Sequence, residues 1–145
     1  MSLSQALTDE AKKPTIIADC LQLIDDEVKD KRGLSGAAIK AGYKAVKGIK
    51  PGFIQNVVEG LLPEFAEGLD PIHAEAVAKG QDVTSYFDAH SDRVADALLN
   101  ITDAKAAKST NGLVKGTYKR LRGSAKKNVE AAVPRLAKLI ETHAG

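Results

Sequence analysis

The residue best suited to chemistry by type and setting is His90, which lies between Asp88 and Asp92 in a repeat of apolar residues. A histidine ring titrates near neutral pH, so a half-buried one can serve as a general base or a pH switch. The same pattern fits a helix residue with one hydrogen-bond partner, and we favour that interpretation. A substrate or small-ligand pocket beside His90 is kept as one functional hypothesis.

Cys20 is the only cysteine and lies between aliphatic residues such as Ile16 and Leu23. A catalytic thiol needs an exposed, electropositive setting, whereas a thiol among apolar groups behaves as a small hydrophobic residue. The neighbouring Asp19 opposes a thiolate further. We therefore predict a structural role for Cys20, and no disulfide within the chain.

One pair of residues, Asp70-x-x-His73, partly matches the spacing of a metal-binding motif. A di-iron helical bundle needs Glu-x-x-His on two helices with further glutamates, and this chain has no second copy. It also lacks a cysteine pair and a glycine-rich phosphate loop. We predict no metal and no cofactor, and the sequence leans against an enzyme without deciding the question.

Charge is the feature with most functional meaning, because residues 105–145 hold ten Lys/Arg and two Asp/Glu. Such a segment can bind an anionic partner, either nucleic acid or acidic lipid. The alternative, which we favour, is a solvated face or pairing with the acidic stripe Asp88, Asp92, Asp96 and Asp103. The candidate anion-binding residues form what we call the basic cluster: Lys115, Lys119, Arg120, Arg122, Lys126 and Lys127.

These residues must be positioned by helices, because apolar residues recur at spacings of three and four along the chain. We expect an all-α fold of about six to eight helices, arranged as a compact bundle or an orthogonal array. Residues 1–145 form a single domain in this interpretation. The expected helices cover residues 3–12, 14–31, 35–50, 51–69, 71–80, 82–108, 113–122 and 124–140.

Several boundaries in this scheme depend on single residues. Gly33 is expected to end a helix and Ser35 to cap the next one. Pro63 should kink the fourth helix or divide it in two, and Asp70 should cap the short helix after it. Gly123 is expected to interrupt the C-terminal region.

Two features point to association between helices. The region 35–50 is rich in Gly and Ala, and Ala38 and Gly42 share a face that another backbone could approach closely. A 4-3-4-3 seam runs from Val83 to Ala104, as in coiled coils. Our leading functional hypothesis is therefore a non-enzymatic interaction or scaffold protein that self-associates through helix faces or binds a protein partner.

The sequence also predicts a cytoplasmic location. Residues 1–13 carry four charged residues and lack the long apolar run of a signal peptide. No stretch approaches the ~20 apolar residues that a membrane span requires.

Several segments together resemble an uncharacterised family of small bacterial helical proteins, a domain of unknown function. They are residues 34–44 (LSGAAIKAGYK), 50–53 (KPGF), 124–130 (SAKKNVE) and 132–136 (AVPRL). The resemblance would extend over nearly the whole chain. It implies a bacterial, cytoplasmic, all-α protein and transfers no functional residue.

Overall fold

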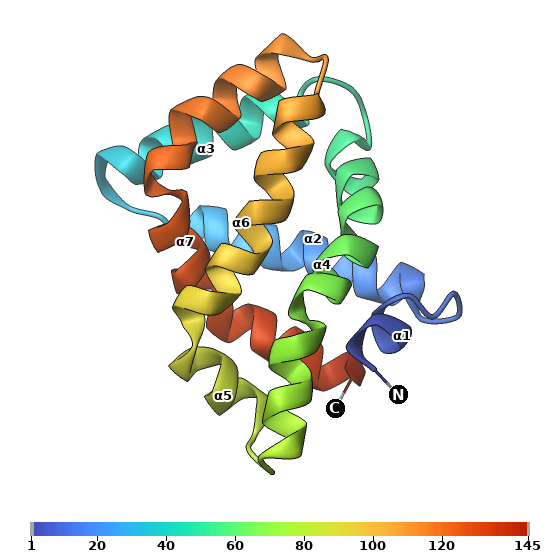
Figure 1. The fold of residues 1–145 in the computed structure, drawn as a ribbon. Coiled ribbons are helices and arrows are strands. Elements are labelled where there is room, and N and C mark those ends of the chain that lie inside the picture. The colour runs from blue at the N-terminus through green and yellow to red at the C-terminus, as the bar shows by residue number, and fades with distance from the viewer. Residues whose placement is uncertain (1, 145) are drawn as a thin grey trace.

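The computed structural model describes residues 2–144, without the side chain of Ser35. Within this range it contains seven α-helices and no strand, which confirms the all-α prediction (Figure 1). The helices are α1 (Leu3–Leu7), α2 (Lys13–Asp30), α3 (Gly33–Lys47), α4 (Phe53–Ala78), α5 (Val83–Ala89), α6 (Ser91–Lys108) and α7 (Gly112–Ala144).

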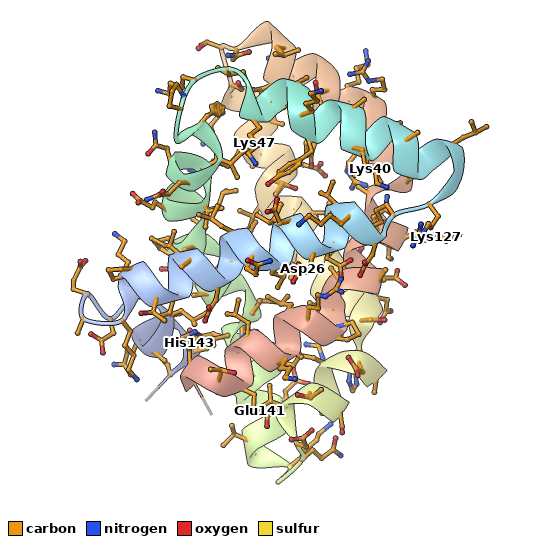
Figure 2. All side chains as sticks on the ribbon, turned by 180° about the vertical axis from the view of Figure 1, so that it is seen from behind. Asp26, Lys40, Lys47, Lys127, Glu141 and His143 are labelled. Atoms are coloured by element: carbon orange, nitrogen blue, oxygen red, sulfur yellow. The ribbon has the colours of Figure 1, made fainter. Side chains whose placement is uncertain are left out.

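The helices form two layers. Helices α4 and α6 run side by side in one layer, with α5 at their lower end (Figure 1). Helices α2 and α3 lie behind them, together with the C-terminal part of α7 (Figure 2). Helix α7 begins beside α6 and then crosses into the second layer. Because α2 crosses α4 and α6 steeply, the arrangement fits the helical array better than a parallel bundle.

Glycine sets two of the helix starts. Helix α3 begins at Gly33 (φ 73°), two residues before the predicted cap Ser35, and the helix-ending role expected of Gly33 was wrong. Gly52 (φ 76°) is the cap residue just before α4. These backbone angles are easily reached by a residue without Cβ. Helix α1 is shorter than expected and ends at Leu7.

Helix α4 continues through both of its prolines. Of the two predictions for Pro63, a kink or a division of the helix, the division is therefore wrong, and so is the separate helix starting at Pro71. Asp70 does not cap a helix of its own. Its carboxylate accepts hydrogen bonds from the backbone N–H and the hydroxyl of Ser4, which ties α1 to α4. The apolar stripe of α4 packs against five other helices, and this packing outweighs the missing backbone donors.

The predicted seam helix is broken at His90. This residue leaves the helical conformation (φ −120°, ψ 33°) and separates α5 from α6. The break turns α5 so that Tyr86 and Phe87 are both buried, which a straight helix with one seam would not achieve. In contrast, the interruption expected at Gly123 is absent, and α7 is helical on both sides of it.

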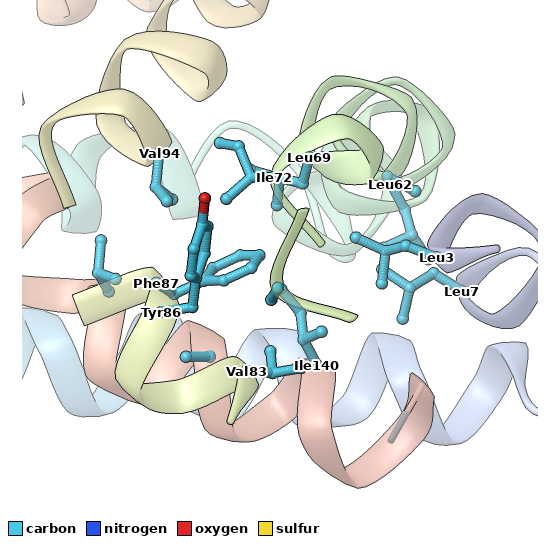
Figure 3. Packing of buried hydrophobic residues seen from close by; sticks show 14 of the residues in the cluster. Leu3, Leu7, Leu62, Leu69, Ile72, Val83, Tyr86, Phe87, Val94 and Ile140 are labelled. Carbon is cyan, nitrogen blue, oxygen red and sulfur yellow. The ribbon is translucent and has the colours of Figure 1, made fainter. Parts of the chain in front are cut away.

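The packed core is built from α1, α5, the beginnings of α2 and α6, and large parts of α4 and α7 (Figure 3). Its largest fully buried side chains include Tyr86, Phe87, Leu3, Leu69 and Ile140. This core is filled in the usual way, with side chains in close contact.

Candidate functional site

A half-open cavity of about 520 Å³ adjoins the packed core, and core residues such as Leu62, Leu69 and Ile140 form part of its wall. Its walls come from α2, α3, α4, α6 and α7, with Leu7 of α1 at one edge. Its lining is largely apolar, and Val57 in it is exposed. Many of its other aliphatic and aromatic side chains are only partly buried: Leu23, Ile24, Val28, Ile39, Ile54, Val58, Leu61, Phe65, Leu121, Val129 and Leu136.

Such a hollow is unusual for a domain of this size. Protein interiors are close-packed, and voids larger than a water molecule are few. At about 24 cal/mol per Å³, a closed and empty cavity of this volume would cost on the order of 10 kcal/mol, comparable with the whole stability of a domain, and the half-open shape of this one reduces that cost. The contrast with the packed core marks the cavity as the candidate site.

Helix α3 accounts for part of the empty space. Its side chains are mostly small, and Ile39 and Tyr43 are its contributions to the lining. The close approach predicted for its glycine face occurs at Gly42, where an added Cβ would lie 3.0 Å from Thr117 Cγ2 and 3.1 Å from Leu121 Cδ1. Ala38 of the same predicted face is exposed.

Two charged residues line the cavity, Glu27 and Lys31, near the end of α2. They form an ion pair of 3.2 Å, and their side chains are 12% and 15% exposed. Arg135 NH1 donates to the other oxygen of Glu27 at 3.0 Å, and the same guanidinium binds Asp30. This hydrogen bond from Arg135 lowers the pKa of Asp30. The backbone carbonyl of Asn128 lies 3.5 Å from Lys31 Nζ.

The remaining polar groups of the lining already have partners or are neutral. The Tyr43 hydroxyl donates to Asp25 at 2.9 Å, and burial together with that carboxylate raises the pKa of Tyr43 to about 12. Burial, and secondly Asp19, raises the pKa of Cys20 to about 11, so the thiol is protonated near neutral pH. The Thr102 hydroxyl is bonded to Leu99 O and to the Tyr118 hydroxyl.

This lining is suited to binding and offers little for catalysis. The thiol of Cys20 is not a nucleophile in its protonated form. Within residues 2–144, no three His, Cys, Asp or Glu side chains come together as metal ligands.

A second, smaller hollow of about 360 Å³ adjoins the cavity and shares Tyr43 and Ile54 with it. It lies between α2, α3 and the start of α4, and it is more polar. Gln22, Asp25, Lys47 and Gln55 are among its lining residues.

The basic cluster lies along α7, outside the cavity lining. Arg122 makes a two-point contact with Asp103, and Lys126 Nζ lies 3.1 Å from Asp96 Oδ1. Part of the acidic stripe therefore does face the cluster. The other four members are exposed at the surface: Lys115, Lys119, Arg120 and Lys127.

His90 lies away from the cavity lining, at the junction of α5 and α6. Its Nδ1 is 2.8 Å from the carbonyl oxygen of Tyr86, and its ring stacks on the Tyr86 ring with centroids 4.2 Å apart. The candidate site thus lies among residues that sequence reasoning did not select.

His73 is buried within α4 at 6% exposure, and its Nε2 has no hydrogen-bond partner among the described residues. Burial lowers the pKa of this ring, against a smaller opposing effect of Asp70. Asp70, the other member of the Asp70-x-x-His73 pair, is bound to Ser4 and so belongs to the contact between α1 and α4.

One sequence signal could have indicated the cavity. The apolar stripe of residues 53–69 is wide, and the facing helix 35–50 is made of small residues. A wide apolar face packed opposite a helix of small side chains leaves unfilled volume between the two helices unless another element fills it.

The fold and the cavity together define a class, an all-α protein with a largely apolar, half-open hollow between five helices. None of the helices described within residues 2–144 could span a membrane. The chain belongs to a family of unknown function, DUF6918, whose model matches residues 3–144. Comparison with curated proteins and with solved structures found no match.

Proposed function

We propose that the protein binds a small hydrophobic molecule in the cavity between α2, α3, α4, α6 and α7. The observation that carries this proposal is the volume of about 520 Å³ with an apolar lining. Ligand pockets in proteins fall in the range of roughly 300–1,000 Å³ and are lined mainly by hydrophobic side chains. A bound apolar molecule would supply the contacts that the partly buried lining residues lack.

The experiment is a titration with a neutral fluorescent dye, N-phenyl-1-naphthylamine, followed by displacement with straight-chain alcohols. The proposal predicts one saturable site per chain. Affinity should rise about fourfold for each added methylene, from about 0.8 kcal/mol per buried CH₂, until the cavity is full.

Two variants place the site. Ala125 lines the cavity, so Ala125→Phe should occupy it and weaken dye binding at least tenfold. The matched control is Val77→Phe, at a residue that is 61% exposed on α4. Equal binding by both variants, or an unsaturable signal, would contradict the proposal.

Self-association as a scaffold remains a proposal with less support. The seam that motivated it is largely used within the chain, because Val83, Phe87 and Val94 are at most 7% exposed. Analytical ultracentrifugation at micromolar concentration tests it, and a monomer alone would count against it.

A second candidate function is anion binding through the four exposed members of the basic cluster, Lys115, Lys119, Arg120 and Lys127. Electrostatic binding to nucleic acid or acidic lipid is strongest at low salt. A gel-shift assay and a liposome assay at ~50 mM salt, where such binding is still strong, should therefore reveal it. No binding in either assay would remove this function.

We also propose a location in the bacterial cytoplasm. The free thiol of Cys20 agrees with a reducing compartment, where thiols persist. Fractionation of cells with an antibody against the protein would test this.

A further inference from the structure

Two charged side chains lie together at one place in the otherwise apolar lining of the cavity. The chemistry of these two groups indicates which class of hydrophobic molecule fits best. Lys31 and Glu27 are the charged side chains of the lining, and both are more than four-fifths buried. A molecule that fills the apolar part of the cavity therefore places one of its ends near this pair. The nature of that end decides whether the contact is favourable.

Lys31 can change partner without leaving Glu27 unpaired. Glu27 accepts from Lys31 at one oxygen and from Arg135, at 3.0 Å, at the other. A buried carboxylate that lost both cations would be strongly destabilising, but here Arg135 remains. Glu27 thus holds Lys31 in place in the empty protein and keeps a cation when Lys31 turns to a ligand.

The ammonium group of Lys31 has three N–H donors and no acceptor. One donates to Glu27, and one points to the Asn128 carbonyl at the long distance of 3.5 Å. A group that binds to Lys31 must therefore be an acceptor. A carboxylate is the best match, since a charged acceptor makes the strongest hydrogen bond to an ammonium.

The local charge agrees with an added anion. The pKa of Asp30 is lowered by Arg135 and, through space, by Arg32 and Lys31. At this end of the cavity, Lys31 and Arg135 pair with Glu27, and Arg135, Arg32 and Lys31 all act on Asp30.

We propose that the ligand is a free straight-chain monocarboxylate, with its chain in the apolar cavity and its carboxylate on Lys31 Nζ. This inference rests on the proposed binding function. It specifies the ligand class for the same cavity.

The test compares dodecanoate with dodecan-1-ol, which has the same chain and no charge, by displacement of the neutral dye below micellar concentrations. Wild-type protein should bind dodecanoate roughly ten- to a hundredfold more tightly, the value of one charge-assisted hydrogen bond. Lysophosphatidylcholine with the same chain, in which the carboxyl is esterified, should bind no better than the alcohol.

Lys31→Met removes the charge and keeps the length of the side chain. It should abolish the preference for dodecanoate and change alcohol binding by less than about twofold, since the aliphatic wall is retained. The matched control is Lys29→Met, an exposed lysine on the same helix outside the lining, which should behave as wild type.

The outcomes separate the two proposals. If neither compound nor the dye binds, the binding function itself fails. If the alcohol binds as tightly as the acid, or if dodecylamine binds more tightly than both, the assignment of a carboxylate to Lys31 is overturned and the cavity proposal stands. The wild-type ratio decides this even if Lys31→Met does not fold.

Discussion

Filling the cavity should stabilise the protein, and Ala132→Leu is the substitution that shows it most clearly. Ala132 lies on α7 and lines the cavity. Leucine adds three carbon atoms, which at about 0.8 kcal/mol per buried CH₂ contribute roughly 2.4 kcal/mol. Ordering the larger side chain costs about 0.5–1 kcal/mol. The expected gain is therefore about 1.5 kcal/mol in the free energy of unfolding.

The control is Ala137→Leu, five residues further along the same helix. Ala137 is fully buried in the packed core. Inserting the same atoms there should destabilise by about 1–3 kcal/mol, because close-packed neighbours must move. Urea titrations of both variants and the wild type give the two free energies, and unchanged m-values would show that compactness is unaffected.

The opposite signs are the core of this prediction. If Ala132→Leu destabilises by as much as Ala137→Leu, the cavity region is packed as tightly as the core. The reasoning from an empty interior would then be refuted.

Three further predictions concern other buried positions. Burial lowers the pKa of His73, so below about pH 6.5 the unfolded chain takes up a proton that the folded chain does not. The free energy of unfolding should therefore fall as the pH is lowered. Urea titrations between about pH 7 and 5 should show a smaller fall for His73→Leu than for the wild type. The pKa of Cys20 is about 11, so mass spectrometry at about pH 8 should show alkylation by iodoacetamide roughly a hundredfold slower than for a free thiol, and rates within a few-fold would contradict this burial. Gly42→Leu should lower the free energy of unfolding by 1–3 kcal/mol, because its Cβ alone would lie 3.0 Å from Thr117, whereas Gly60→Leu, with open space around it, should change the midpoint of urea unfolding little.

The all-α fold could be predicted because burial of one helix face leaves a period of three to four in the sequence. The boundaries were harder, since they depend on tertiary contacts. The 4-3-4-3 spacing continues unchanged through His90, so nothing local indicates the break that lets Tyr86 and Phe87 be buried together. The chemistry of Pro63 indicates a kink or a division of the helix, and the sequence does not show that the packing of α4 keeps it undivided.

The cavity could not be predicted for a related reason. A periodic apolar stripe shows that a helix face is covered, and it does not show whether the covering helices meet. That depends on crossing angles, and α2 crosses α4 and α6 steeply (Figures 1 and 2). The pairing of Lys31, Glu27 and Arg135 was equally hidden, because Arg135 lies 108 positions from Glu27 in the chain.

The basic cluster was predicted from charge alone, and the structure divides it. Arg122 and Lys126 reach the acidic stripe because α6 and α7 run alongside each other as sequence neighbours. The sequence could not show which cations of the cluster face away from α6, since the helix between Lys115 and Lys127 carries cations on several faces.

The most direct test of the account is an NMR titration of the methyl-labelled protein with dodecan-1-ol. The account predicts saturable shifts and intermolecular contacts between the ligand chain and the methyl groups of Leu61, Leu121 and Val129, which line the cavity, with those of Leu3 and Ile72 in the packed core much less affected. Contacts restricted to exposed methyl groups such as those of Leu34 and Val77, or no saturable shift at all, would contradict it.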